Sequence, residues 1–225
     1  MWSLVRRLPL SLIFVLGTTV LAVATGALGG GTPASVIDRF GYSLDRLKSG
    51  HLDVVPISDW LVVGPSHWAS MLLLYALFAA PLEYLGGTGL LAQAFFLGSW
   101  IATIATSLVV SMLGRSLHWH PHPDLVHQTD VGGSVGTWAA AGALNVLIAG
   151  QARWIVWPVR IGSAVYLGRQ LSAVHGTADV AHLLGFCIGS VIGARSVQSH
   201  QRPSARDHDE LQPDRARAAA VARSR

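Results

Sequence analysis

The sequence is poor in charge and in cysteine. Charged residues make up 12% of the 225 residues, whereas a soluble domain usually carries about 25%. The charges collect between long apolar runs and towards the end of the chain, which is typical of a membrane protein with several spans. The formal net charge of +4 comes largely from arginines near the two ends, where it indicates membrane topology rather than nucleic-acid binding. Cys187 is the single cysteine, so an internal disulfide is excluded.

Six apolar segments predict membrane-spanning helices. They cover residues 8–28, 66–86, 89–113, 132–150, 154–171 and 179–194. Arg160 interrupts the fifth segment, but an arginine near a helix end can reach the membrane interface. We therefore expect an all-α, polytopic bundle of six transmembrane helices over residues 1–195, with a core from about residue 50. A disordered, basic cytoplasmic tail is expected over residues 196–225.

Basic residues outside the long loops set the expected orientation. They precede the first span, occupy the short fourth loop and follow the last span; they are Arg6, Arg7, Arg153, Arg195 and Arg202. With six spans all of them lie on one side, and that side should be the cytoplasm. We expect an integral protein of a bacterial plasma membrane with both termini inside. A cleaved signal peptide is the alternative for the first segment, but its apolar run has the length of a span.

Three polar residues fall at a similar depth in the second, fourth and sixth segments. His67 begins the second, Ser134 lies four residues past Asp130, and His182 lies three residues past Asp179. In six spans these three helices all enter from the outer face, which brings one hydroxyl and two imidazoles to the same level. A serine needs a base to become a nucleophile, and a neutral histidine is suited to that role.

A second histidine and the backbone N–H groups at the start of the fourth helix could hold an oxyanion. Gly132 and Gly133 would let that backbone approach a substrate carbonyl. The structural alternative is ordinary: a serine bonded to its own backbone, a packed histidine, and a stripe of glycines for helix packing. On spacing alone, both interpretations stay open.

Three sequence stretches resemble rhomboid intramembrane serine proteases. "AHLLGFCIG" is similar to the last-helix motif A-H-x-x-G-x-x-x-G, and "GGSVGTWAAAG" is similar to the helix that carries G-x-S-G. "HWASMLLLYALFAAPLEYLGG" resembles the second core helix, which begins with histidine, here His67, and ends with a glutamate, here Glu83, before a glycine. The motifs occur in the family's order.

The resemblance implies a reaction and a site. Ser134 would be the nucleophile and His182 the base of a dyad, while His67 and the Ser134 N–H would line the oxyanion hole. Glycines would allow close helix packing near the site: Gly132, Gly136, Gly185 and Gly189. The substrates would be transmembrane proteins cut near the outer face, with the fifth helix as a lateral gate. The lipid bilayer is the other expected partner, and no cofactor, metal or nucleic acid is expected.

Two residues depart from the family pattern. Val135 stands where a glycine usually follows the serine, and Met71 replaces an asparagine one turn after His67, so a hydrogen-bond donor is lost. These changes keep open a catalytically inactive rhomboid-like protein that binds membrane-protein clients. An unrelated transporter or structural membrane protein is a further alternative. The loop "HWHPHPDLVH", residues 118–127, could hold a transition metal, although a solvated polar loop is favoured.

Overall fold

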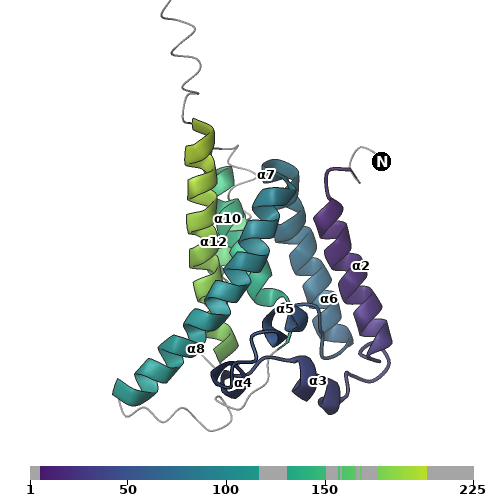
Figure 1. The fold of residues 1–225 in the computed structure, drawn as a ribbon. Helices are drawn as coiled ribbons and strands as arrows, with labels where there is room; N and C mark the ends of the chain where they lie inside the picture. Colours follow the sequence, from purple (N-terminus) through teal and green to yellow (C-terminus); the bar gives the residue numbers. More distant parts are fainter. Residues whose placement is uncertain are drawn as a thin grey trace, which may run out of the picture. The chain divides into compact units, whose positions relative to one another are not determined.

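The computed structural model describes residues 6–116, 131–150, 157, 159–165, 168 and 177–201. Every secondary-structure element in these ranges is a helix, which confirms the all-α fold class (Figure 1). The longer helices are α2 (Pro9–Ala24), α6 (Pro65–Leu74), α7 (Ala80–Ala92), α8 (Gly98–Ser116), α10 (Ser134–Leu147) and α12 (Thr177–Gln201). The shorter elements are α3 (Ala34–Phe40), α4 (Leu44–Lys48), α5 (Val54–Ser58), the π-helical turns η1 (Tyr75–Ala79) and η2 (Gln93–Leu97), and the 3-10 turn η3 (Ile148–Gly150).

The helical stretch that contains α6, α7 and α8 reverses direction at Gly87. The backbone there has φ 82° and ψ 163°, a conformation that favours glycine. The ring centroids of Tyr75 and Phe95 are 6.2 Å apart, whereas twenty residues of straight helix would separate them by about 30 Å. The stretch therefore forms two antiparallel arms (Figure 1), which correspond to the separate segments expected at 66–86 and 89–113.

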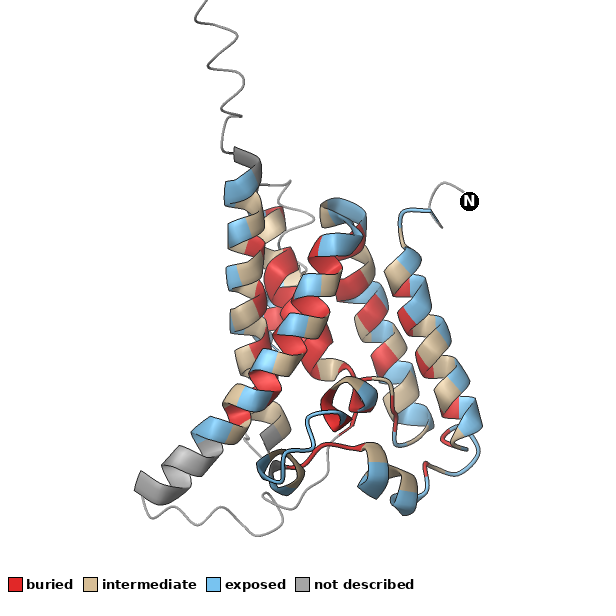
Figure 2. Ribbon diagram, in the orientation of Figure 1, coloured by how far each residue is buried: buried red, intermediate tan, exposed pale blue. Residues whose placement is uncertain are grey.

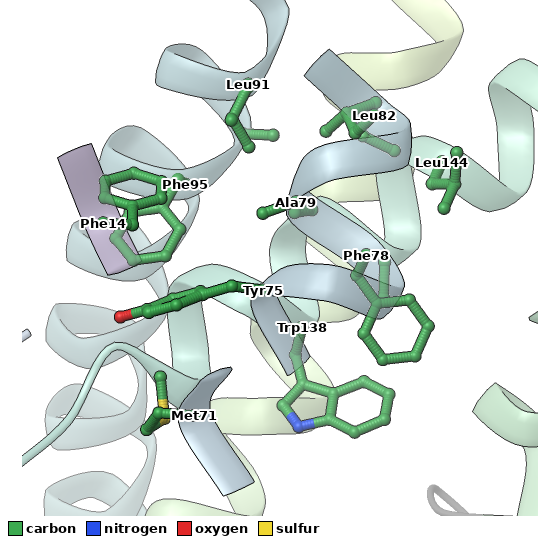
Figure 3. Packing of buried hydrophobic residues seen from close by; sticks show 14 of the residues in the cluster. Phe14, Met71, Tyr75, Phe78, Ala79, Leu82, Leu91, Phe95, Trp138 and Leu144 are labelled. Carbon is green, nitrogen blue, oxygen red and sulfur yellow. The ribbon is translucent and has the colours of Figure 1, made fainter. Parts of the chain in front are cut away.

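Helix α10 lies at the centre of the compact unit formed by residues 1–194. It contacts both arms of the Gly87 hairpin, and every residue from Val135 to Leu144 is buried (Figure 2). Most of these residues are small, so the hairpin arms and α12 approach α10 closely. Large side chains of the neighbours, together with Trp138 and Leu144 of α10 itself, pack in the main apolar cluster (Figure 3).

Helix α2 is fixed to this core at two places. In its middle, the ring of Phe14 is fully buried, with its centroid 4.1 Å from that of Phe95. At its start, Glu83 accepts hydrogen bonds from the N–H groups of Leu10 (2.9 Å) and Ser11 (2.8 Å), and from the Ser11 hydroxyl (2.7 Å). These N–H groups belong to the first helical turn and have no partner within the helix, so the Glu83 carboxylate caps α2.

Two helical stretches of the described residues are long and apolar enough to cross a membrane. They are Pro65–Val109, which includes the Gly87 reversal, and Ala178–Ser199. Helix α2 is apolar but shorter. Helix α10 has 14 residues and is therefore only about 21 Å long.

The sixth expected segment differs from the structure in extent, and the fifth lies partly outside the described residues. The fifth, 154–171, is described only at 157, 159–165 and 168, all of which are helical. The sixth was expected to end at residue 194, but α12 continues to Gln201 and so includes the first residues of the expected tail. The rest of the tail and the histidine-rich loop at 118–127 lie outside the described residues.

Candidate active site

The site is built at the N-terminal end of α10, where two glycines precede the serine. Gly132 has a φ of +113°, and its N–H donates to the Ser58 carbonyl at 2.7 Å. A Cβ on Gly132 would lie 2.8 Å from the ring atoms Cε1 and Nε2 of His67. Glycine is therefore needed both for the backbone conformation and for the approach of this imidazole.

Gly133 is enclosed on three sides. A Cβ at this position would lie 2.7 Å from Phe95 Cζ, 2.8 Å from the Asp59 carbonyl oxygen and 3.0 Å from the Tyr75 hydroxyl. The tight surroundings fix the turn before Ser134, the first residue of α10. The N–H groups in the first turn of a helix have no partner within it, so this end is suited to stabilising negative charge.

Ser134 and His182 are hydrogen bonded to each other. His182 Nε2 lies 2.8 Å from Ser134 Oγ, although the two residues are on different helices. The imidazole is buried, with 7% of its surface exposed, while Ser134 is partly exposed. Trp138, one turn after the serine on α10, places its ring centroid 6.4 Å from that of His182 and so limits the space around the imidazole. The side chains are arranged as a nucleophile and a base.

Close contact between α10 and α12 brings these two side chains together. A Cβ on Gly185 would lie 2.8 Å from the Val135 carbonyl oxygen, and a Cβ on Gly189 would overlap the carbonyl group of Ala139. Both glycines of the last-helix motif therefore allow α12 to lie directly on the backbone of α10.

The other two glycines expected near the site have different contacts. Gly136 faces the ring of Phe95, at 2.9 Å from its Cβ position, and so makes room for the hairpin arm rather than for α12. Gly132 precedes α10, and its lack of a side chain leaves space for the His67 ring. Neither of these two glycines therefore packs α10 against α12.

His67 is held in one tautomer by the backbone. Its Nδ1 accepts a hydrogen bond from the Val63 N–H at 3.2 Å, so Nδ1 is unprotonated and the neutral ring carries its hydrogen on Nε2. This Nε2 is the atom that lies against Gly132. His67 is thus arranged to donate a hydrogen bond next to the start of α10.

The two departures from the family pattern are both accommodated in the core. Met71 is buried, with 1% of its surface exposed, and packs in the main apolar cluster (Figure 3). Val135 is also buried, and its Cγ1 lies 3.3 Å from the Cβ position of Gly185. The absence of a side chain at Gly185 leaves the room that this β-branched residue needs, and the Ser134–His182 hydrogen bond is present alongside it.

Several residues around the site are not among the positions that the sequence analysis singled out. Asp59 and Tyr75 contribute to the enclosure of Gly133, and the Trp138 ring lies near that of His182. Asp59 and Tyr75 act through contacts between distant segments, which no spacing rule predicts. Trp138 at i+4 from Ser134 could have been found from helical geometry, since residues four apart share a face.

Metal ligands do not gather in the part of the chain that the structure describes. No group of three or more histidine, cysteine, aspartate or glutamate side chains there could hold a metal ion.

Comparisons with protein-family models, with curated proteins and with solved structures find no match for this chain. The side chains and their contacts are therefore the basis for inferring a function.

Proposed function

We propose that this chain is a rhomboid-like intramembrane serine protease. The observation that carries the proposal is the 2.8 Å contact between Ser134 Oγ and His182 Nε2 at the start of a buried helix. A serine that merely satisfies its hydroxyl in a helix usually bonds a backbone carbonyl of the preceding turn. Ser134 begins its helix and bonds an imidazole instead, which favours a chemical role.

The reaction is an acyl transfer in two stages. His182 Nε2 takes the proton of Ser134 Oγ as this oxygen attacks the carbonyl carbon of the scissile peptide bond. The carbonyl π electrons move to oxygen, and when they return the C–N bond breaks and His182 gives its proton to the leaving amine. Water then attacks the acyl-serine with His182 as base, which releases the acid and restores the serine.

The transient oxyanion has two donors available in this site. They are the Nε2–H of His67 and the backbone N–H of Ser134, which belongs to the first turn of α10. A methionine at position 71 supplies no third donor. Since one oxyanion donor is typically worth about 10²–10³ in rate, we expect a slow enzyme.

The proposed setting is a membrane. Six spans would comprise α2, the two arms of the Gly87 hairpin, α10, the helical residues at 159–165 and α12. The exposed faces support this arrangement, because large apolar side chains cover the outer surface of α2; they are Leu12, Ile13, Leu16, Val20 and Val23. The substrates would be transmembrane proteins of a bacterial plasma membrane, cut near the outer face, with both termini of the enzyme in the cytoplasm.

A second candidate function is a catalytically inactive relative that binds membrane-protein clients. Met71 favours it, because a buried methionine stands where the family places a hydrogen-bond donor. In that case the contact between Ser134 and His182 would serve only to hold the two helices together.

Labelling by an alkyl fluorophosphonate in native membranes separates the two functions. The protease predicts that wild-type protein is labelled and that Ser134→Ala and His182→Ala are not. Cys187→Ala is a suitable control, because this exposed side chain lies on the same helix as the base. Labelling that persists in Ser134→Ala would refute the nucleophile, and folded wild-type protein that resists labelling would favour the client-binding function.

A further inference from the structure

Asp59 is a buried carboxylate that belongs neither to the dyad nor to the oxyanion donors. It directly follows α5 in the segment between α2 and α6, and 5% of its surface is exposed. Ser99 of α8, of which 1% is exposed, donates its hydroxyl hydrogen to Asp59 Oδ1 at 2.9 Å. A carboxylate is expensive to bury unless it is hydrogen bonded, so this contact fastens the segment to α8.

The backbone at Asp59 supports the turn that leads to the nucleophile. The preceding residue, Ser58, accepts the hydrogen bond from the Gly132 N–H at 2.7 Å. The carbonyl oxygen of Asp59 itself lies 2.8 Å from the Cβ position of Gly133. Gly132 and Gly133 immediately precede Ser134, so any shift of this segment moves the backbone that presents the Ser134 N–H.

We propose that Asp59 is a positioning residue for the oxyanion site. Its side chain, held by Ser99, fixes the Ser58–Asp59 backbone, and this backbone fixes the turn so that the Ser134 N–H points at the developing negative charge. The inference rests on the protease function proposed above. Asp59 gains and loses no proton in the reaction, because the proton of Ser134 goes to His182.

The expected effect falls on the chemical step rather than on binding. An oxyanion donor acts when charge develops on the attacked group, so misplacing it slows the attack of Ser134 on a peptide carbonyl or on the phosphorus of a fluorophosphonate, which loses fluoride. The affinity for the reagent stays unchanged. A displacement of about 1 Å in a catalytic arrangement lowers the rate by up to about 10²-fold. A purely structural role for Asp59 would lower the amount of folded protein but not the rate at which the folded fraction reacts with the fluorophosphonate.

The test uses an alkyl fluorophosphonate with the full chain in detergent micelles. It measures separately the maximal rate constant of inactivation, kinact, and the inhibitor dissociation constant, Ki, and Tm is recorded for every variant. Asp59→Ala and Ser99→Ala should lower kinact by about tenfold or more, with Ki unchanged. Asp59→Asn keeps an oxygen that accepts from Ser99 and should retain most of the rate. The matched control is Ser107→Ala, also on α8, whose hydroxyl donates to the Thr103 carbonyl of its own helix at 3.0 Å; its kinact should equal that of wild type.

The outcomes separate this inference from the proposed function. Wild-type kinact in folded Ser99→Ala overturns the positioning role, and so does a raised Ki at constant kinact. Ser99→Ala decides the question if Asp59→Ala does not fold, because it removes a single oxygen atom. Folded wild-type protein that is not labelled at all would instead refute the protease function.

Discussion

Substituting Gly189 by alanine tests whether the packing of α12 on α10 creates the dyad. The new Cβ would overlap the Ala139 carbonyl group and lie 2.7 Å from Ala139 Cα. Carbon atoms pack best at about 3.5–4.0 Å, so the two helices would have to separate by about 1 Å. Overpacking of this kind destabilises a protein by about 1–3 kcal/mol.

The same displacement reaches the site, because His182 lies two helical turns from Gly189. The distance between Ser134 Oγ and His182 Nε2 would grow from 2.8 Å to about 3.8 Å, beyond hydrogen-bond range. We expect labelling by the fluorophosphonate to fall by about 10²-fold and Tm to decrease.

The matched control is Gly162→Ala in the helical stretch 159–165. A Cβ at Gly162 meets no atom within 4 Å, so the same substitution should leave labelling unchanged. Its Tm should be equal or higher, since alanine favours a helix by about 1 kcal/mol over glycine. Labelling of Gly189→Ala at the wild-type rate would refute the reasoning that backbone contact between the helices assembles the dyad.

Two further substitutions test other contacts of the core. Glu83→Ala removes the acceptor of two N–H groups at the start of α2 and of the hydroxyls of Ser11 and Thr88. The free energy of unfolding, measured by denaturation in micelles, should therefore fall by about 3 kcal/mol or more. Unchanged stability would show that α2 is not held by this carboxylate. Met71→Asn places an amide one turn after His67 and should raise kinact about tenfold or more. A kinact at or below the wild-type value in folded protein would place position 71 outside the proposed oxyanion site.

The sequence predicts the long helices and the common depth of Ser134 and His182, because both leave a periodic signal, whereas their pairing as a dyad is implied only by the resemblance. Apolar runs of the length of a span mark the helices, and the positions of Ser134 and His182 relative to the ends of their helices place them at one depth. The turn of the hairpin is also marked in the sequence, by the adjacent glycines Gly86 and Gly87, and Gly87 has a positive φ. These features depend on neighbours in the chain, which a single sequence displays directly.

The supports of the site could not be predicted in the same way. The enclosure of Gly133 combines residues from the loop after α5, η1 and η2, and nothing in their local sequence indicates that they meet. The partner of Gly136 could not be predicted, because a helical glycine can face any neighbour, and here the neighbour is Phe95. The hydrogen bond between Asp59 and Ser99 joins residues 40 positions apart and is visible only in three dimensions.

Mass-spectrometric mapping of the fluorophosphonate adduct tests the central claim most directly. The wild-type protein is treated in membranes and digested, and the peptide that carries the added mass is fragmented. The account predicts a single adduct on Ser134 Oγ, which is absent when His182 is replaced by alanine. An adduct on a different residue, or one on Ser134 that forms equally fast without the imidazole of His182, would contradict it.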